Sequence, residues 1–388
     1  MTDSEKFTVI VPTRQRADVL GPALETIVTQ DYDNLRILVS DNFSNDTTRD
    51  VVESFNDPRI AYHNTGKRLS MSHNWEFALS HISDGWIAIV GDDDGLLPGS
   101  LARVSEIARE YGVKAIGSRN AAYTWPCIPE QPFGKISVSL KSGVSLHDSK
   151  KCLSSTCHGH TAYSSLPMLY TGGFIHSNLV EQARNASGVF YHSMNPDIYS
   201  AVIFTKLTDR FAFSNEPLAI GGSSRHSTGT SSFSAAPREN PADTPASKFF
   251  SEPNIPFHEK LLTSDHGMPP PSIELFVYES LLQSEHLPPS CTTLTDHAGQ
   301  LAIILGRAKR RHRKDLSDWA QMFAQRHDLD MAAISKKARA IRVRLKLNKS
   351  LRKLTEKLDT VNISGNSDLP IRNVYDASLV VSTVLNQR

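Results

Sequence analysis

The sequence has little cysteine and no long apolar run. Four cysteines among 388 residues do not suggest a disulfide framework, so we expect a reduced protein of the cytoplasm. The polar residues 1–6 lead directly into the first apolar segment, which leaves no room for the apolar part of a signal peptide. No apolar run approaches the roughly 20 residues needed to span a bilayer. The expected location is cytoplasmic, with any contact to the inner membrane face being peripheral.

Two common glycine-rich nucleotide-binding motifs are also missing. The first predicted strand is not followed by G-x-G-x-x-G, and no G-x-x-x-x-G-K-[ST] occurs anywhere. Glycines at these spacings let the backbone approach phosphate groups closely. Their absence removes the main sequence support for dinucleotide-binding and P-loop folds.

Net charge is nearly absent overall but unevenly distributed. The formal net charge of +1 argues against a general nucleic-acid binder, and no nucleic-acid partner is expected. Residues 307–357, however, carry 17 Lys/Arg against five Asp/Glu. A basic helical segment of this kind can bind anionic lipid head groups, and it can equally be a solvated face whose apolar positions pack inward. Both interpretations stay open.

Apolar runs alternate with helical patterns through the first third of the chain. The predicted strands are residues 8–11, 35–39, 60–63, 86–90 and 115–117. Strands that alternate with helices predict an α/β fold with a largely parallel sheet covered on both faces. We divide the chain into an α/β domain (1–235), a proline-rich polar linker or surface wrap (236–271) and a mainly helical, basic region (272–388).

The apolar run 86–90 ends in three consecutive carboxylates, Asp92, Asp93 and Asp94, between two glycines. Adjacent carboxylates repel one another, so a fold that holds three of them at a strand end usually offsets the repulsion. A hard divalent cation does this, and so does a solvated turn. Taken alone, the triplet is more often a solvated loop.

Other polar side chains also follow predicted strand ends. They are Pro12, Thr13, Arg14, Asp41, Lys67 and Arg68. Ligands of open α/β sheets bind outside the carboxyl ends of the strands. These residues and the acidic triplet are therefore expected to form one crevice for a base, a ribose, a diphosphate and a metal ion.

Two segments further along also suggest a site. Asn195-Pro196-Asp197 has the form of a helix start, with Asn195 as the cap. An acidic residue in a first turn can serve stability alone or catalysis. The segment 221–231 is rich in glycine and serine and contains Arg225 and His226. It is either a loop that closes over a phosphate or a plain linker.

The middle of the chain gives weaker signals. Residues 123–151 lose clear periodicity, so we expect an irregular excursion with one hairpin, and residues 165–177 are expected to line the acceptor side of the site. The motif Cys152-x4-Cys157-His158-x-His160 invites a zinc hypothesis. Its two pairs are too close for the usual two-arm spacing, so incidental Cys and His are favoured.

Together these motifs resemble glycosyltransferase family 2, the large inverting group with the GT-A fold. The resemblance covers roughly residues 7–235 and rests on the order and spacing of five motifs. They are Val9-Ile10-Val11-Pro12-Thr13-Arg14, Ser40-Asp41-Asn42, Ser70-Met71-Ser72-His73-Asn74-Trp75, Gly91-Asp92-Asp93-Asp94 and Pro196-Asp197-Ile198-Tyr199. In this context the metal interpretation of the acidic triplet is favoured.

The resemblance implies roles in binding a nucleoside-diphosphate sugar. The donor-binding residues would be Pro12, Thr13, Arg14, Asp41, Lys67, Arg68, Asp92, Asp93 and Arg225. The first three would border the nucleobase and ribose, and Asp41 would accept hydrogen bonds from the base. Asp92 and Asp93 would hold the ribose and donor sugar. Arg225 would add a hydrogen-bond donor when its loop closes.

The resemblance also implies a metal site and a base. Asp94 would ligate Mn²⁺ or Mg²⁺ bridging the diphosphate, and His226 would complete the metal shell as in some relatives. Asp197 would be the catalytic base, although the family often has paired acidic residues there and this chain has one. A base that takes the acceptor's proton during direct attack gives inversion.

The predicted activity is metal-dependent inverting transfer of a sugar, with UDP as the expected nucleotide, to a glycan or lipid-linked acceptor in surface polysaccharide biosynthesis. One alternative is a nucleotidyltransferase, which would want a glycine-rich phosphate loop that the first strand lacks. Another is a non-catalytic scaffold that holds membrane or nucleic acid through the basic segment 307–357.

Overall fold

The computed structural model describes residues 5–126, 132–227, 249, 252–262, 269–287, 296–356 and 359–387, and for 347–356 only the backbone. Four parallel strands form one side of its sheet, in the order β3-β2-β1-β4. They are β1 (Phe7–Thr13), β2 (Leu35–Asp41), β3 (Ile60–Asn64) and β4 (Trp86–Ile89). All four lie where the apolar runs predict them.

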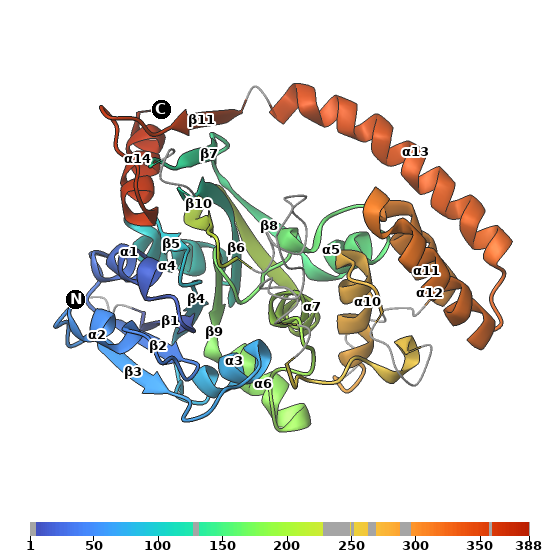
Figure 1. Ribbon diagram of the computed structural model, residues 1–388, viewed down its shortest axis with the longest axis horizontal. Coiled ribbons are helices and arrows are strands. Elements are labelled where there is room, and N and C mark those ends of the chain that lie inside the picture. The colour runs from blue at the N-terminus through green and yellow to red at the C-terminus, as the bar shows by residue number, and fades with distance from the viewer. Residues whose placement is uncertain are drawn as a thin grey trace.

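Helices follow these strands, as the alternating pattern predicts. They are α1 (Ala17–Val28), α2 (Thr48–Glu53), α3 (Met71–Leu79) and α4 (Ser100–Tyr111). The α4 helix begins two residues after Pro98, because Gly99 takes the left-handed conformation at its N-cap. Figure 1 shows these strands and helices on the N-terminal side of the molecule.

The rest of the sheet is mixed. The strand β9 (Gly173–His176) runs antiparallel between β4 and β6 (Ala115–Thr124). Beside β6 lie β10 (Arg210–Ser223), which is parallel to it, and β7 (Lys135–Ser139), which is antiparallel. The short β5 (Gly95–Leu96) and β8 (Val144–Asp148) pair antiparallel with β10. The α/β class is confirmed, and the parallel pairing is concentrated in β1–β4.

Two segments that were predicted to be irregular contain residues of the sheet. The expected hairpin within 123–151 is formed by β6 and β7, with Ala122 opposite Ser137. The segment 221–231 was expected to be a loop from its first residue, but residues 221–223 are the end of β10. Residues 221–223 pair with β6 through the backbone, and a glycine-rich sequence gives no local signal for such a strand.

A buried helix joins the sheet to the C-terminal region. Ten of the twelve residues of α7 (Pro196–Leu207) are buried. It contacts α5 (Ser149–Cys157) and α6 (Ser177–Ser187), and on another side α10 (Ile273–Gln283). One continuous apolar cluster includes α7 and the helices α10, α11 (His297–Arg307) and α12 (Arg313–Arg326). The expected helical C-terminal region is confirmed.

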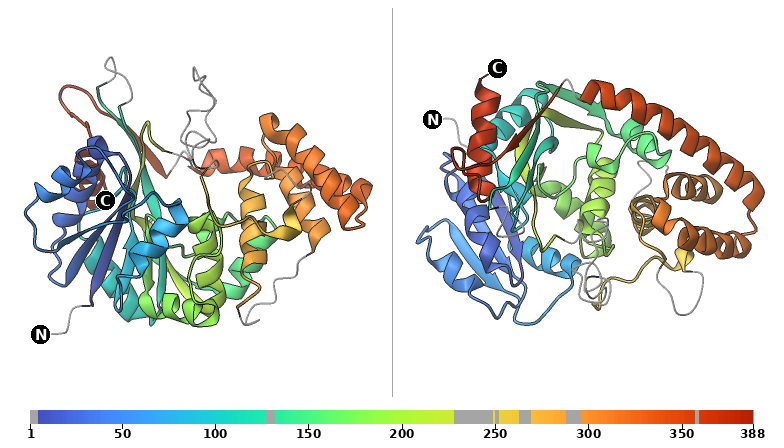
Figure 2. Two further views of the ribbon diagram at one scale, coloured as in Figure 1. Left: turned by 60° about the horizontal axis from the view of Figure 1, so that its bottom comes forward. Right: turned by 45° about the horizontal axis from the view of Figure 1, so that its top comes forward.

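The end of the chain returns to the sheet. After the 26-residue α13 (Met331–Glu356), the strand β11 (Thr360–Ser364) pairs antiparallel with β7, and α14 (Val374–Asn386) packs on α1. Figures 1 and 2 show α13 running along the outside from the helical region back to the sheet. The boundary at residue 272 stays a prediction. Among the helices of the described ranges, none is both long and apolar enough to cross a membrane.

Candidate active site

Two adjoining cavities lie where β1, β4, the end of β10 and the start of α7 meet. Their volumes are about 490 and 480 Å³. The first is lined by the predicted site residues Pro12, Thr13, Arg14, Arg68, Asp92 and His226. The second is lined by Asp93, Asp94 and Asp197. Both cavities share Arg16, Met71, Trp75, Tyr170 and Phe249, so they form one continuous crevice.

The three aspartates of the acidic turn are buried, and each has a different partner. Asp92 accepts a hydrogen bond from Nη1 of Arg16 at 2.6 Å, and Arg16 also donates to the backbone oxygen of His226. Burial raises the pKa of Asp92 above its ordinary value, although the charge of Arg16 opposes this. This ion pair fastens the loop after β1 to the acidic turn.

The second aspartate holds the segment that follows β10. Oδ2 of Asp93 accepts hydrogen bonds from Oγ of Ser224 at 2.6 Å and from Oγ of Ser227 at 2.7 Å. The strand approaches very closely here, because a Cβ built on Gly222 would lie 1.7 Å from the backbone oxygen of Asp93. Only glycine fits at residue 222 in this arrangement.

The third aspartate lies between β10 and the segment before β9. Its Oδ1 accepts from the backbone N–H of Gly222 at 2.6 Å, and its Oδ2 accepts from Oγ1 of Thr171 at 2.5 Å. Burial, and then the negative charge of Asp93, raise the pKa of Asp94 to about 7. Within the described residues, no Lys or Arg side chain forms an ion pair with Asp94. Mg²⁺ and Mn²⁺ take carboxylate oxygens as ligands, so an ion of this kind would offset the charge of Asp94.

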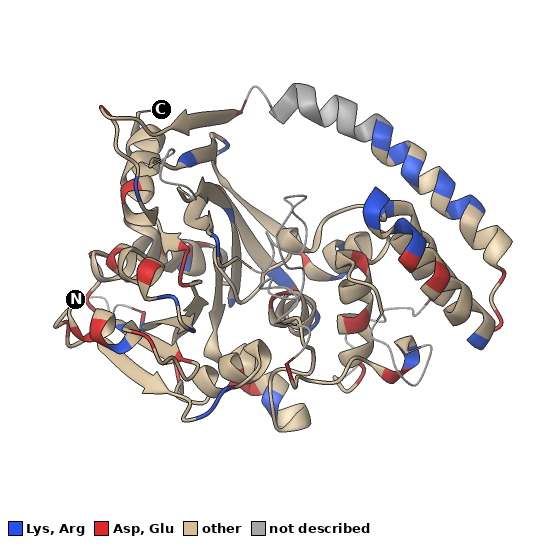
Figure 3. Ribbon diagram, in the orientation of Figure 1, with Lys and Arg blue, Asp and Glu red and all other residues tan. Residues whose placement is uncertain are grey.

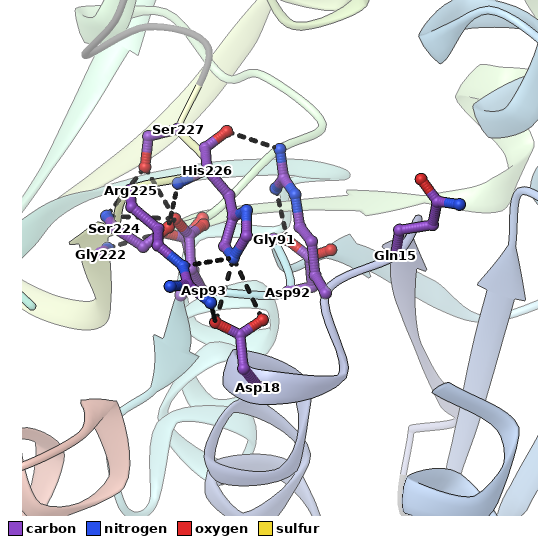
Figure 4. Close-up of polar contacts among 12 residues, drawn as sticks. Gln15, Asp18, Gly91, Asp92, Asp93, Gly222, Ser224, Arg225, His226 and Ser227 are labelled. Atoms are coloured by element: carbon purple, nitrogen blue, oxygen red, sulfur yellow. Dashed lines mark hydrogen bonds and ion pairs between the residues drawn. The ribbon is translucent and has the colours of Figure 1, made fainter. Parts of the chain in front are cut away.

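The predicted metal ligand His226 has another partner here. Its Nε2 lies 3.0 Å from Oδ2 of Asp18 at the start of α1, and Nη2 of Arg225 donates to the same oxygen at 3.0 Å (Figure 4). The imidazole is thus held on Asp18 rather than on Asp94. Within the described ranges, no three His, Cys, Asp or Glu side chains are grouped to hold an ion. A metal ion here would draw on the acidic turn and on the ligand's own oxygens.

The predicted base lies at the first turn of α7. Oδ2 of Asp197 accepts a hydrogen bond from the hydroxyl of Tyr163 at 3.1 Å. Burial raises the pKa of Asp197, while this bond and the backbone N–H of Ile198 lower it. Pro196 is at the first helical position as predicted, but the side chain of Asn195 makes no capping hydrogen bond.

A tyrosine lies between the predicted base and the acidic turn. Tyr170 lines both cavities and stacks on Trp75 with ring centroids 5.3 Å apart. Burial raises its pKa well above the usual value, and the charges of Asp94 and Asp197 act in the same direction. Tyr170 therefore stays protonated, and its hydroxyl hydrogen-bonds to Asp94, which lowers the pKa of that carboxyl. It falls within residues 165–177, the segment expected on the acceptor side.

The arginines of the first cavity are already paired. Nη1 of Arg14 and Nη2 of Arg68 donate to the two carboxylate oxygens of Glu252, at 3.0 and 2.5 Å. The side chain of Glu252 is only 13% exposed. A carboxylate from the linker thus occupies the place where two predicted donor-binding cations meet.

Three predicted donor-binding residues line neither cavity. Asp41 is buried and accepts from the hydroxyl of Tyr62 at 2.5 Å and from Nδ2 of Asn64 at 3.0 Å. Lys67 is exposed beside the first cavity's Arg68, and Arg225 is exposed on Asp18. Asp41 nevertheless neighbours the crevice, because its strand partner Thr13 and the next residue, Asn42, line the first cavity.

Sequence reasoning missed several residues of the site. They are Arg16, Asp18, Tyr163, Tyr170 and Glu252. Arg16 could have been predicted from the sequence, because it lies in the same loop as Arg14. The others carry no local signal, since their partners are 34 to 238 residues away in the sequence.

The zinc motif does not form a cluster. Cys152 and Cys157 both lie on α5, and Sγ of Cys152 lies 3.8 Å from Nδ1 of His147. The rings of His158 and His160 lie 6.2 Å apart, beyond the end of the helix.

A family model and two curated proteins match part of this chain. Residues 8–162 match the family model "Glycosyl transferase family 2". The curated protein "GalNAc(5)-diNAcBac-PP-undecaprenol beta-1,3-glucosyltransferase" of Campylobacter jejuni is 36% identical over 116 residues, which are 29% of this chain and 38% of that protein. "Glycosyltransferase GlyA" of Streptococcus pneumoniae is 33% identical over 99 residues, 24% of this chain and 14% of that protein. The matches thus span well under half of the length of these relatives.

Solved structures give weaker likenesses. Residues 1–349 of TarS from S. aureus align with a TM-score of 0.46 at 12% identity, covering 84% of this chain and 93% of that one. The mannosyltransferase PcManGT from Pyrobaculum calidifontis, solved with GDP-Man and Mn²⁺, aligns with a TM-score of 0.38 at 15% identity and covers 88% of each chain. The family match and the curated relatives agree with the resemblance in the sequence: residues 8–162 of this chain are similar to glycosyl transferase family 2.

Proposed function

We propose that this protein is a metal-dependent inverting glycosyltransferase. It moves a sugar from a nucleoside-diphosphate sugar, with UDP as the expected nucleotide, to a glycan or lipid-linked acceptor in surface polysaccharide biosynthesis. The observation that carries the proposal is the continuous crevice that joins the acidic turn to Asp197 through Tyr170. The name of the Campylobacter jejuni relative, which describes glucosyl transfer to an undecaprenol-linked glycan, supports the acceptor class.

In this proposal Asp197 is the base. Tyr163 donates to its Oδ2, and the carboxylate accepts the proton of the attacking acceptor hydroxyl. A carboxylate at that position deprotonates the hydroxyl as it attacks the anomeric carbon from the face opposite the diphosphate. A single displacement of this kind inverts the configuration. Trp75 and Phe276 offer flat apolar walls to the sugar rings in the second cavity.

The first cavity is the proposed donor site. Pro12, Thr13 and Arg14 border the nucleobase and ribose, with Asp41 behind them as an acceptor for the base. The donor sugar lies toward Asp92 and Asp93, and Lys67, Arg68 and Arg225 supply positive charge near the phosphates. Entry of a diphosphate at Arg14 and Arg68 requires that Glu252 leave them, because both anions use the same donors.

Asp94 is the proposed protein ligand of Mn²⁺ or Mg²⁺. Its uncompensated burial beside Asp93 is the feature that supports this, because a cation would remove the repulsion. When bound, the ion would supply Lewis-acid stabilisation of the departing diphosphate. His226 joins it only if the imidazole leaves Asp18.

The basic segment 307–357 supports a peripheral location at the inner membrane face, where a lipid-linked acceptor is presented. Figure 3 shows Lys and Arg along the described half of α13, without Asp or Glu between them. Such a helix gains about 1 kcal/mol per cation near an anionic surface.

Calorimetric titration tests the donor and metal sites together. The full chain is titrated with UDP, GDP and dTDP, each with and without Mn²⁺, alongside Asp94→Ala. Metal-dependent binding of one nucleotide, lost in Asp94→Ala and retained in the exposed control Asp209→Ala, is the expected result. Failure of every nucleotide to bind under both conditions would refute the donor site.

A further inference from the structure

A third cavity lies away from the candidate active site, among α5, α11 and α13. Its volume is about 520 Å³, in the range of small-ligand pockets. It shares no lining residue with the two cavities of the crevice. The proposed reaction therefore leaves this cavity without a role.

The rim of this cavity is cationic. It contains Lys150 from α5 and Lys337 and Arg344 from α13, together with His158 and His160. One carboxylate lines it, Asp296, and Oδ1 of that residue accepts the backbone N–H of Gly299 as the N-cap of α11. The rim thus carries a net positive charge even with neutral imidazoles.

These cations are poorly compensated by protein groups. Nη2 of Arg344 donates to Nδ1 of His160 at 3.1 Å, and no carboxylate within the described ranges pairs with it. Nζ of Lys337 lies at the 4.0 Å limit from Asp296. Lys150 has no ion-pair partner in the part of the chain that the structure describes. Three long cationic side chains from two different helices therefore converge on one opening and remain available to an anion.

The floor of the cavity is apolar. It is formed by Leu153 and Cys157 of α5, Ile303 of α11 and Ile341 of α13. The helices meet closely below it, because a Cβ on Gly306 would lie 2.8 Å from Ile341. An apolar floor beneath a cationic rim suits a ligand that is anionic at one end and apolar next to it.

We infer that this cavity binds the phosphate head group of an anionic lipid, with the adjoining part of the chain on the apolar floor. A phosphate takes charge-assisted hydrogen bonds from lysine and arginine, the side chains that this rim presents. Free phosphate shares the head-group chemistry but makes no use of the floor. The inference does not rest on the proposed transfer reaction, because binding is measured without donor or turnover.

The test uses a soluble short-chain lipid, so that diffuse attraction to a membrane plays no part. The full chain is titrated by calorimetry with dihexanoyl phosphatidic acid below its micelle concentration, with dihexanoyl phosphatidylcholine and with inorganic phosphate. We expect saturable one-to-one binding of phosphatidic acid, at least about tenfold tighter than binding of the other two ligands.

Matched double variants locate the site. Lys337→Ala/Arg344→Ala removes two rim cations and should weaken phosphatidic acid binding about tenfold or more. Lys336→Ala/Arg339→Ala removes the same charge from the same helix outside the cavity and should leave the affinity within about twofold. Lys150→Ala, on the opposite wall, should also weaken binding.

Two results would overturn the inference. Equal losses in both double variants would mean that α13 attracts anions diffusely and that the cavity is not the site. If inorganic phosphate bound as tightly as phosphatidic acid, the acyl chains would contribute nothing to binding, and the ligand would not be a lipid. Nucleotide titration of the same variants separates this test from the proposed function, because that binding should be unchanged in all of them.

Discussion

The acidic turn and α13 both concentrate charge of one sign, yet the fold treats them in opposite ways. Asp92, Asp93 and Asp94 are each at most 5% exposed, and each is held by a different element. In the described half of α13, residues 331–346, the Lys and Arg side chains lie mostly in solvent, with no carboxylate on the same stretch. Of these two clusters, only the acidic turn places charged side chains of one sign in the protein interior.

The difference lies in what each cluster does to the stability of the fold. Burial raises the pKa values of Asp92 and Asp94, and the cost of burying their charge has to be offset by hydrogen bonds, an arginine or a cation. Solvated cations on a helix surface repel one another only weakly at physiological salt. A buried cluster of like charge therefore indicates a site, whereas an exposed one indicates a surface.

The largest effect is expected at the predicted base. Asp197→Asn keeps the shape of the side chain but removes the proton acceptor, so the transfer rate should fall by about 10²- to 10⁴-fold with nucleotide affinity unchanged. Because burial raises the pKa of Asp197, the wild-type rate should also fall as the pH drops below that raised value. Steady-state kinetics across pH measure both. Asp209→Asn, an exposed site beyond the same helix, is the control, and a near-normal rate in Asp197→Asn would rule out this base.

The close approach of β10 to the acidic turn is the next test. Gly222→Ala places a Cβ against the backbone oxygen of Asp93, so the free energy of unfolding should fall by about 4 kcal/mol. The neighbouring Gly221→Ala meets nothing nearer than 3.9 Å and should be nearly neutral. Chemical denaturation of Gly222→Ala and Gly221→Ala measures the difference. Equal stabilities of the two variants would show that the acidic turn is not packed tightly against β10.

A buried carboxylate outside the crevice sharpens the comparison further. Burial raises the pKa of Glu279 on α10 to about 7 from an ordinary 4.5, and Oγ of Ser193 donates to it at 2.5 Å. The folded state thus favours the protonated form. Stability should be complete below about pH 4.5 and decline as the pH rises toward 7, by on the order of 3 kcal/mol in total.

Glu279→Gln should remove that dependence. The variant should match the wild type near pH 4.5 and exceed its unfolding free energy by roughly 3 kcal/mol at pH 8, as measured by denaturation at several pH values. Glu285→Gln, in an exposed pair with Lys260, is the control and should leave the dependence intact. A wild-type stability that rises between pH 5 and 7 more steeply than that of Glu279→Gln would contradict the assignment.

A smaller effect is expected where the linker meets the crevice. Glu252→Gln removes the anion that pairs with Arg14 and Arg68, so a nucleoside diphosphate should bind about tenfold more tightly, or by about 1.4 kcal/mol. Calorimetry with and without Mn²⁺ measures this, with Glu285→Gln again as the control. Unchanged or weaker binding would mean that the donor does not displace Glu252.

The smallest effect is expected on the exposed side of α13. Lys336→Ala/Arg339→Ala should change the free energy of unfolding by no more than about 0.5 kcal/mol, because both side chains face solvent. Thermal unfolding checks this. A large change in the free energy of unfolding would contradict the description of these α13 side chains as a solvated surface.

Much of the N-terminal sheet could be predicted from the sequence. The apolar runs and their spacing placed β1 to β4 and the helices between them, because side-chain periodicity reports burial locally. The glycines and aspartates at 91–95 likewise marked the turn after β4. The antiparallel β9 between β4 and β6 could not be foreseen, since strand direction depends on how the chain returns and not on its local pattern.

The sequence alone determined β1 to β4, the acidic turn at the end of a strand and the helix that begins at Pro196, because proline at a first helical position, propensity and alternation act within a few residues. Only the tertiary structure decided which charges meet. Glu252 reaches Arg14 from 238 residues away, and His226 reaches Asp18 from 208. The physical reason is that an ion pair depends on where closure of the whole chain brings two side chains, and no local signal encodes that distance.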